Sequence, residues 1–268
     1  MTTSTTTLAS ALGKARAEGR SALIGYLPAG FPSKEGCVKA ARAMVEAGCD
    51  VIEIGLPYSD PLMDGPTIQD AVHVSLSNGT RIADVLRTVE GVAASGAATL
   101  VMTYWNPIDR YGADRFARSL ADAGGAGTIT PDLTPEESGP WREASATAGI
   151  DTVFLVAPSS TEERIQAVTA CCTGFVYAAS LMGVTGARES ISSGAEGLVK
   201  RTRAHTDLPV CVGLGVGTGA QAAEVAGYAD GVIVGSAFCR RLLDAPDEAA
   251  GVAAARELAA ELAAGVRR

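Results

Sequence analysis

Histidine and lysine are scarce in this chain of 268 residues, which contains only two histidines, His73 and His205. These two residues lie far apart and form no pair with metal-ligand spacing, so we expect no metal site. The lysines all fall outside the ends of the strands predicted below; they are Lys14, Lys34, Lys39 and Lys200. A lysine Schiff base is one of the usual means of cleaving a carbon–carbon bond. The sequence offers no lysine at a position suited to that role.

Long apolar runs and an excess of positive charge are also lacking. No apolar stretch approaches the ~20 residues that a membrane-spanning helix needs. The first seven residues, Met-Thr-Thr-Ser-Thr-Thr-Thr, lack the basic start and apolar segment of a signal peptide. A net charge of −8 argues against a nucleic-acid partner, because phosphate binding needs a basic surface. The six cysteines show no C-x-x-C spacing and are typical of reduced thiols. We therefore expect a cytoplasmic protein that binds neither a membrane nor nucleic acid.

Apolar runs of strand length alternate along the chain with segments of helical periodicity. We predict strands at 22–27, 51–55, 99–104, 127–130, 152–157, 175–180, 209–213 and 231–235. Helices are predicted between them at 37–47, 135–148, 161–170, 195–205 and 218–226, with further helices at 8–18 and 247–264. Such alternation predicts a parallel sheet covered on both faces. The length suits one barrel, typically roughly 250 residues.

The number of strand–helix units favours a closed barrel over an open, doubly wound sheet. A Gly-x-Gly-x-x-Gly motif near the start would favour the open sheet, and the sequence has no such motif there. We predict that residues 1–268 form a single domain of the α/β class, a (β/α)₈ TIM barrel. An extra helix precedes the first strand, and additional helices lie in the βα-loops. The longest connections follow the second and sixth strands. In a barrel the βα-loops build the active-site face, so functional residues are expected there first.

The second predicted strand reads Val-Ile-Glu-Ile-Gly and carries an acid at Glu53. Because side chains alternate along a strand, Ile52 and Ile54 face the helices while Glu53 points into the barrel. Burial there is costly for a carboxylate and raises its pKa toward the range useful in acid–base catalysis. The loop that follows adds Asp60 and Asp64. Neither acid need be functional. Glu53 could be a solvated residue on an exposed strand, and Asp64 could form a turn before Gly65.

Glycine-rich turns follow three late strands, at Gly183 to Gly186, at Gly213 and Gly215, and at Gly235 with Ser236. Glycine lets the backbone approach an anion, and helix N-termini present free N–H groups to it. Phosphate sites recur after the seventh and eighth strands of barrels. We therefore predict phosphate binding, although glycines also serve simple turns. Three further side chains lie near strand ends, those of Tyr104, Asn106 and Tyr177. They either line an aromatic pocket or pack the barrel mouth.

The run Glu-Ile-Gly-Leu-Pro-Tyr-Ser-Asp-Pro-Leu-Met-Asp-Gly-Pro-Thr-Ile-Gln, from Glu53 to Gln69, resembles the signature of the tryptophan synthase alpha subunit family. The resemblance covers essentially the whole chain and includes the Gly-Val-Thr-Gly segment at 183–186. The preference for arginine over lysine and the abundant alanine resemble actinobacterial members. The resemblance implies retro-aldol cleavage of indole-3-glycerol phosphate to indole and glyceraldehyde 3-phosphate, with no metal and no cofactor in this chain.

The resemblance also implies roles for individual residues. Glu53 is the main acid and base, and Asp64 holds the indole N–H and assists tautomerisation. Tyr177 supports Glu53, and Thr185 approaches both acids when a lid spanning 181–193 closes. The indole pocket is lined by Tyr26 and Met102. The phosphate is bound by Gly186, Gly213, Gly215, Gly235 and Ser236.

Members of this family pair with a beta subunit that carries pyridoxal phosphate, in an alpha2beta2 heterotetramer. The resemblance places the loop at 57–60 at that interface. Three alternatives stay open on the sequence. The chain could be a free-standing indole-3-glycerol phosphate lyase, or a non-catalytic barrel that binds phosphate ligands and regulates a partner, although that role would not need Glu53 and Asp64. A phosphosugar isomerase leaves the Pro-Tyr-Ser-Asp loop unexplained.

Overall fold

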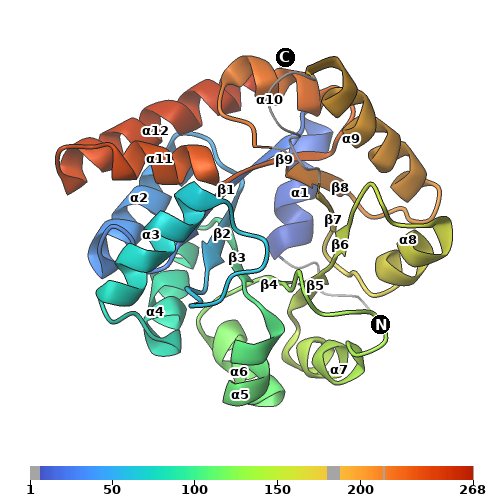
Figure 1. Ribbon diagram of the computed structural model, residues 1–268, viewed down its shortest axis with the longest axis horizontal. Helices are drawn as coiled ribbons and strands as arrows, with labels where there is room; N and C mark the ends of the chain where they lie inside the picture. Colours follow the sequence, from blue (N-terminus) through green and yellow to red (C-terminus); the bar gives the residue numbers. More distant parts are fainter. Residues whose placement is uncertain (1–6, 180–187, 214, 268) are drawn as a thin grey trace.

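The computed structural model describes residues 7–179, 188–213 and 215–267. Their strands form one sheet in which every neighbouring pair is parallel, and the helices surround the strands as a ring (Figure 1). The strands are β1 (Ala22–Pro28), β2 (Val51–Gly55), β3 (Ala98–Met102), β4 (Gly127–Ile129), β5 (Asp151–Val153), β6 (Leu155–Val156), β7 (Val176–Ala179), β8 (Val210–Gly213) and β9 (Gly231–Val234).

The sheet closes into a barrel through the fifth predicted strand. The strand order is β5-β4-β3-β2-β1-β9-β8-β7-β6, so the two ends of the order are consecutive in the chain. Only Phe154 separates β5, which pairs with β4, from β6, which pairs with β7. The carbonyl of Phe154 accepts the N–H of Tyr177 at 3.1 Å, which continues the ladder. The predicted TIM barrel is confirmed, with its fifth strand divided where it changes partner.

The helices include those predicted from periodicity and others inside the βα-connections. They are α1 (Thr7–Ala17), α2 (Lys34–Glu46), α3 (Pro66–Ser77), α4 (Ile82–Ala93), α5 (Trp105–Tyr111), α6 (Ala113–Asp122), α7 (Gly139–Ala148), α8 (Glu162–Thr169), α9 (Arg188–Arg203), α10 (Gly219–Ala226), α11 (Ser236–Leu243) and α12 (Glu248–Gly265). Two of them, α3 and α4, occupy the long connection between β2 and β3. Among the described residues, none of these helices combines the length and apolarity that a membrane crossing requires.

Three predicted helix starts differ from the structure by three residues or more, and the first of them, α2, begins at Lys34 and not at 37. Helix α7 begins at Gly139 and not at 135, because the preceding residues form a turn in which the Ser138 hydroxyl donates to the Pro135 carbonyl at 2.9 Å. Helix α9 begins at Arg188, so the backbone at 188–193 is helical where a loop was predicted. Serine and glycine lower helix propensity by at most about 1 kcal/mol per residue, which an adjoining helix can outweigh.

The sheet separates two apolar cores. Inside the barrel, Val51, Leu100 and Ile129 pack with Leu8 and Leu12 of α1, which closes the amino end of the barrel. Figure 1 shows α1 within the circle of the outer helices. The larger core lies between the sheet and those helices.

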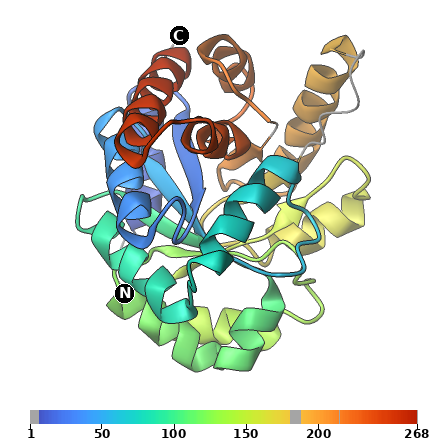
Figure 2. The same ribbon diagram turned by 60° about the vertical axis from the view of Figure 1, so that its left-hand side comes forward.

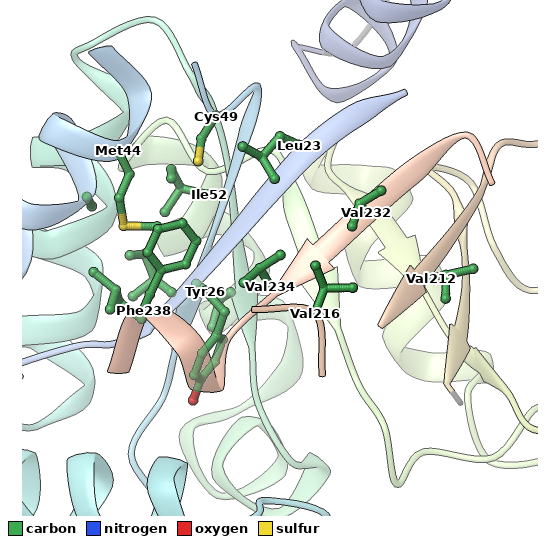
Figure 3. Close-up of a cluster of buried hydrophobic side chains, with 14 of the residues drawn as sticks. Leu23, Tyr26, Met44, Cys49, Ile52, Val212, Val216, Val232, Val234 and Phe238 are labelled. Atoms are coloured by element: carbon green, nitrogen blue, oxygen red, sulfur yellow. The ribbon is translucent and has the colours of Figure 1, made fainter. Parts of the chain in front are cut away.

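Helix α2, β2 and α11 meet at β1. In Figure 3, Met44, Ile52 and Phe238 gather on the helix side of this strand. A Cβ atom at Gly25 would lie 2.4 Å from Cε of Met44, so glycine allows the close approach.

Candidate active site

Glu53 projects from β2 into the barrel, as the alternation predicted. Its neighbour Val51 belongs to the inner core, whereas Ile52 and Ile54 belong to the outer one. Only 1% of Glu53 is exposed, and its Oε1 atom has no hydrogen-bond partner within the described part of the chain. Burial alone raises the pKa of Glu53 from 4.5 to about 8. The group can therefore change protonation state near neutral pH, which is what a catalytic acid or base requires.

Two tyrosines flank Glu53 inside the barrel. Tyr26 stands opposite Glu53 in the pairing of β1 with β2 and is 6% exposed. Burial raises the pKa of Tyr26 well above its usual value, and the nearby charges of Asp64 and Glu53 raise it further. The pKa of Tyr177 is likewise raised, first by burial and then by Glu53. Both phenols therefore stay protonated and can donate hydrogen bonds. Among the described residues, no hydrogen bond joins Tyr177 to Glu53.

Gly55, Gly213 and Gly235 leave room for these rings. A Cβ atom at Gly55 would lie 2.3 Å from the Tyr26 hydroxyl, and one at Gly213 would lie 2.2 Å from the Tyr177 hydroxyl. A Cβ atom at Gly235 would lie 3.2 Å from the Tyr26 ring. The sequence analysis interpreted Gly213 and Gly235 as phosphate contacts or simple turns, and it did not anticipate this steric requirement.

Asp64 lies in the loop between β2 and α3 and is partly buried. Burial raises its pKa above the usual value for aspartate. Its backbone carbonyl accepts the Gln69 side-chain amide at 2.7 Å. Asp64 lies at the same carboxyl end of the barrel as Glu53, because the loop that carries it follows β2 and is bonded to Tyr104 after β3. Met102, at the end of β3, packs against both apolar cores and also faces this region.

Tyr104 follows β3 and holds the loop that carries Asp64. Its hydroxyl accepts the backbone N–H groups of Leu62 and Met63, each at 3.0 Å. Its ring lies 5.4 Å from that of Tyr58, whose hydroxyl accepts the Asn106 amide at 3.0 Å. The sequence left open whether Tyr104 and Asn106 line a pocket or pack the mouth. No sequence signal identified their bonds to the loop, because they join segments about forty residues apart.

The remaining glycines lie at neighbouring strand ends. Gly213 ends β8, and Gly215 follows with a positive φ of 67°, which favours glycine. Gly235 precedes Ser236, the first residue of α11, at the end of the adjacent β9. The N-terminus of a helix presents unpaired N–H groups, so Ser236 lies where an anion can bind. Figure 2 shows α11 beside α3, to which it is joined by a hydrogen bond from Arg240 to Thr67.

Thr185 and Gly186 lie outside the described residues. The predicted lid at 181–193 is described only from Arg188 onward, and there only as helical backbone. In the part of the chain that is described, no group of three His, Cys, Asp or Glu side chains is placed to hold a metal ion.

A closed parallel barrel with acids at the carboxyl ends of its strands has the architecture of a barrel enzyme. Residues 12–267 match the family described as the tryptophan synthase alpha chain. The chain therefore belongs to that family.

Curated relatives in actinobacteria carry the same family name. The protein from Streptomyces coelicolor is 62% identical over 257 residues, which cover 96% of this chain and 95% of that protein. The protein from Thermobifida fusca is 60% identical and covers 98% of each chain. These relatives confirm the actinobacterial resemblance of the sequence.

Solved structures confirm the fold. A chain of Mycobacterium tuberculosis tryptophan synthase matches with a TM-score of 0.91 at 52% identity, covering 99% of this chain and 100% of that one. The tryptophan synthase alpha subunit of Legionella pneumophila matches with a TM-score of 0.89 at 30% identity, covering 98% and 99%.

Proposed function

We propose that the chain cleaves indole-3-glycerol phosphate to indole and glyceraldehyde 3-phosphate, as the alpha subunit of tryptophan synthase. The observation that carries this proposal is Glu53, a buried carboxyl group with an unpartnered oxygen and a pKa of about 8. Membership of the tryptophan synthase alpha chain family supplies the substrate. The family match over residues 12–267 also supports a single domain.

The reaction needs proton transfers by both acids. Glu53 donates its proton to C3 of the indole ring, and the N–H proton passes to Asp64, which converts the ring into an electron acceptor. Glu53 then removes the proton of the C3′ hydroxyl. The carbon–carbon bond breaks, its electron pair returns to the ring, and Asp64 returns the proton to nitrogen. The C3′ carbon leaves as the aldehyde, so no water, metal or electron carrier is consumed.

Tyr26, Met102 and Tyr177 form the walls of the indole site. Tyr177 and Tyr26 keep water away from Glu53, which maintains its raised pKa. The phosphate is held by the backbone at Gly213, Gly215, Gly235 and Ser236, where the end of β8 meets the start of α11. The family signature adds Thr185 and Gly186 to this site, and both lie outside the described residues.

A beta subunit covers the loop after β2 in the proposed alpha2beta2 heterotetramer. Leu62 and Met63 support this arrangement, because 78% and 50% of these apolar residues are exposed. Adjacent exposed apolar side chains are typical of an interaction surface. Ser59 and Asp60, in the segment predicted for the interface, are exposed as well. Pyridoxal phosphate belongs to that partner, and the complex is cytoplasmic.

The test is indole release from indole-3-glycerol phosphate by the purified chain, with and without a beta subunit. We expect slow release alone and clear stimulation by the partner. The partner can stimulate only if it binds the active conformation more tightly than the inactive one. Full activity of the isolated chain would favour a free-standing lyase. If the chain releases no indole under either condition but still stimulates the beta subunit, it is a regulatory barrel and the proposed lyase activity is wrong.

A further inference from the structure

The backbone just before Asp64 is held by a single side chain. The Tyr104 hydroxyl accepts the N–H groups of Leu62 and Met63, each at 3.0 Å. A phenol oxygen has two acceptor positions, and these two bonds occupy both. The next residue along the chain is Asp64, so movement of these two peptide groups would displace its carboxylate.

The side chains of this segment cannot provide the same restraint. Leu62 is 78% exposed and Met63 is 50% exposed, so neither is anchored by packing in the core. On the other side, the Asp64 carbonyl is held by the Gln69 side chain at 2.7 Å. The position of Asp64 therefore depends on backbone hydrogen bonds on both sides, and Tyr104 supplies those on the amino-terminal side.

Tyr104 is itself fixed to the barrel. Only 6% of the residue is exposed. The N–H of the preceding Thr103 donates to the Ile129 carbonyl at 3.0 Å. The N–H of the following Trp105 donates to the Asp132 carboxylate at 2.9 and 3.1 Å. The hydroxyl is thus carried by backbone that is tied to β4 and to the loop after it.

We propose that Tyr104 is a positioning residue, which transmits the rigidity of the barrel to Asp64 through the two backbone N–H groups. The inference rests on the proposed function, because it concerns the acid assigned to the indole N–H. A displacement of about 1 Å at such a group can lower turnover up to ~10²-fold.

The first test is Tyr104→Phe, which removes the hydroxyl and keeps the ring against Tyr58. We expect kcat for indole release to fall about tenfold, with a smaller change in KM. Affinity for glycerol phosphate, measured by calorimetry, should stay unchanged because the phosphate residues lie on other strands. The control is Tyr111→Phe at the far end of α5, which should behave as the unmodified chain. Equal kcat in Tyr104→Phe and the unmodified chain would overturn the proposal.

A double variant tests whether Tyr104 acts through Asp64. If it does, Tyr104→Phe should cause no further loss of kcat when it is added to Asp64→Asn. A further tenfold loss would show an independent role and overturn the proposal. Amide hydrogen exchange gives a readout that needs no activity: exchange at Leu62 and Met63 should accelerate in Tyr104→Phe. Unchanged exchange also overturns the proposal, whereas an inactive unmodified chain counts against the proposed function alone.

Discussion

Asp50 and Asp230 at the amino end of the barrel differ from Glu53 at the carboxyl end in how each carboxyl group is paired. At the amino end, Asp50 accepts two hydrogen bonds from Arg20, both at 2.7 Å, and one from the Leu23 N–H at 2.9 Å. Asp230, just before β9, accepts the Val210 N–H at 2.8 Å and Arg203 at 3.0 Å. At the carboxyl end, Glu53 is more deeply buried, and one of its oxygens has no partner among the residues that the structure describes.

The difference separates acids that are suited to stabilise the fold from an acid that is suited to exchange a proton. A carboxylate whose charge is paired stays ionised and ties strands together. A buried carboxyl group without a charged partner gains a raised pKa and remains free to exchange a proton. A cavity of about 700 Å³ also lies at the amino end, between α1 and the starts of β8 and β9. The acid Asp230 in its lining is already paired, so size alone does not identify the reactive end.

The largest expected effect is at the carboxyl end. Glu53→Gln keeps the shape of the side chain and removes proton transfer, so kcat for indole release should fall ~10²- to 10⁴-fold. Glycerol phosphate should still bind, because its site lies on other strands. Steady-state kinetics and calorimetry on the same preparation measure both quantities. Near-normal turnover would remove Glu53 from the mechanism.

The opposite pattern is expected at the amino end. Asp50→Asn removes the more buried charged partner of the Arg20 guanidinium, which is only 5% exposed, and leaves it paired with Glu18, which is 45% exposed. The free energy of unfolding should fall by up to about 3 kcal/mol, the loss typical of breaking a buried pair. Turnover per folded molecule should be retained.

Denaturant unfolding and an activity assay on the folded fraction test this prediction. The control is Glu46→Gln, which removes an exposed ion pair with Arg256 and should cost less than about 1 kcal/mol. Equal losses in the two variants would mean that burial of the Arg20–Asp50 pair is unimportant.

The pH dependence of stability should distinguish Glu53 from the paired acids. Its pKa is about 8 in the folded chain against 4.5 as the ordinary value, so the folded state holds the proton more tightly. Stability should therefore fall as pH rises between these values, by at most about 1.4 kcal/mol per pH unit. Unfolding curves of the unmodified chain and Glu53→Gln across this interval isolate the contribution. Parallel pH profiles would show that Glu53 is not buried as described.

The smallest expected effect tests the packing of the reactive end. Gly213→Ala places a Cβ atom against the Tyr177 hydroxyl and should cost about 1 kcal/mol, because the ring must move. Adding Tyr177→Phe removes the closest atom and should recover part of that stability. Thermal unfolding of the single and double variants measures the recovery. If adding Tyr177→Phe to Gly213→Ala recovers no stability, the contact between the new Cβ atom and the Tyr177 hydroxyl is not the cause of the loss.

The sequence predicted the fold and the central acid because both depend on local periodicity. The alternation of side chains along 51–55 was enough to predict that Glu53 points into the barrel, and eight apolar runs were enough to predict a barrel. The division at Phe154 was not predictable, since it depends on a change of strand partner from β4 to β7. The hydrogen bonds of Tyr104 to the loop that carries Asp64 were also missed, because they reach a segment about forty residues earlier.

The sequence by itself determined the order of strands and helices, the inward face of β2 and the family signature around Glu53. Only the tertiary structure decided which acids are paired, since Arg20 reaches Asp50 across thirty residues while no described residue forms a hydrogen bond with Oε1 of Glu53. Tertiary packing also decided that Gly213 and Gly55 make room for tyrosine rings. Hydrogen bonds, burial and steric clearance act through space, and the spacing of residues along the chain does not record them.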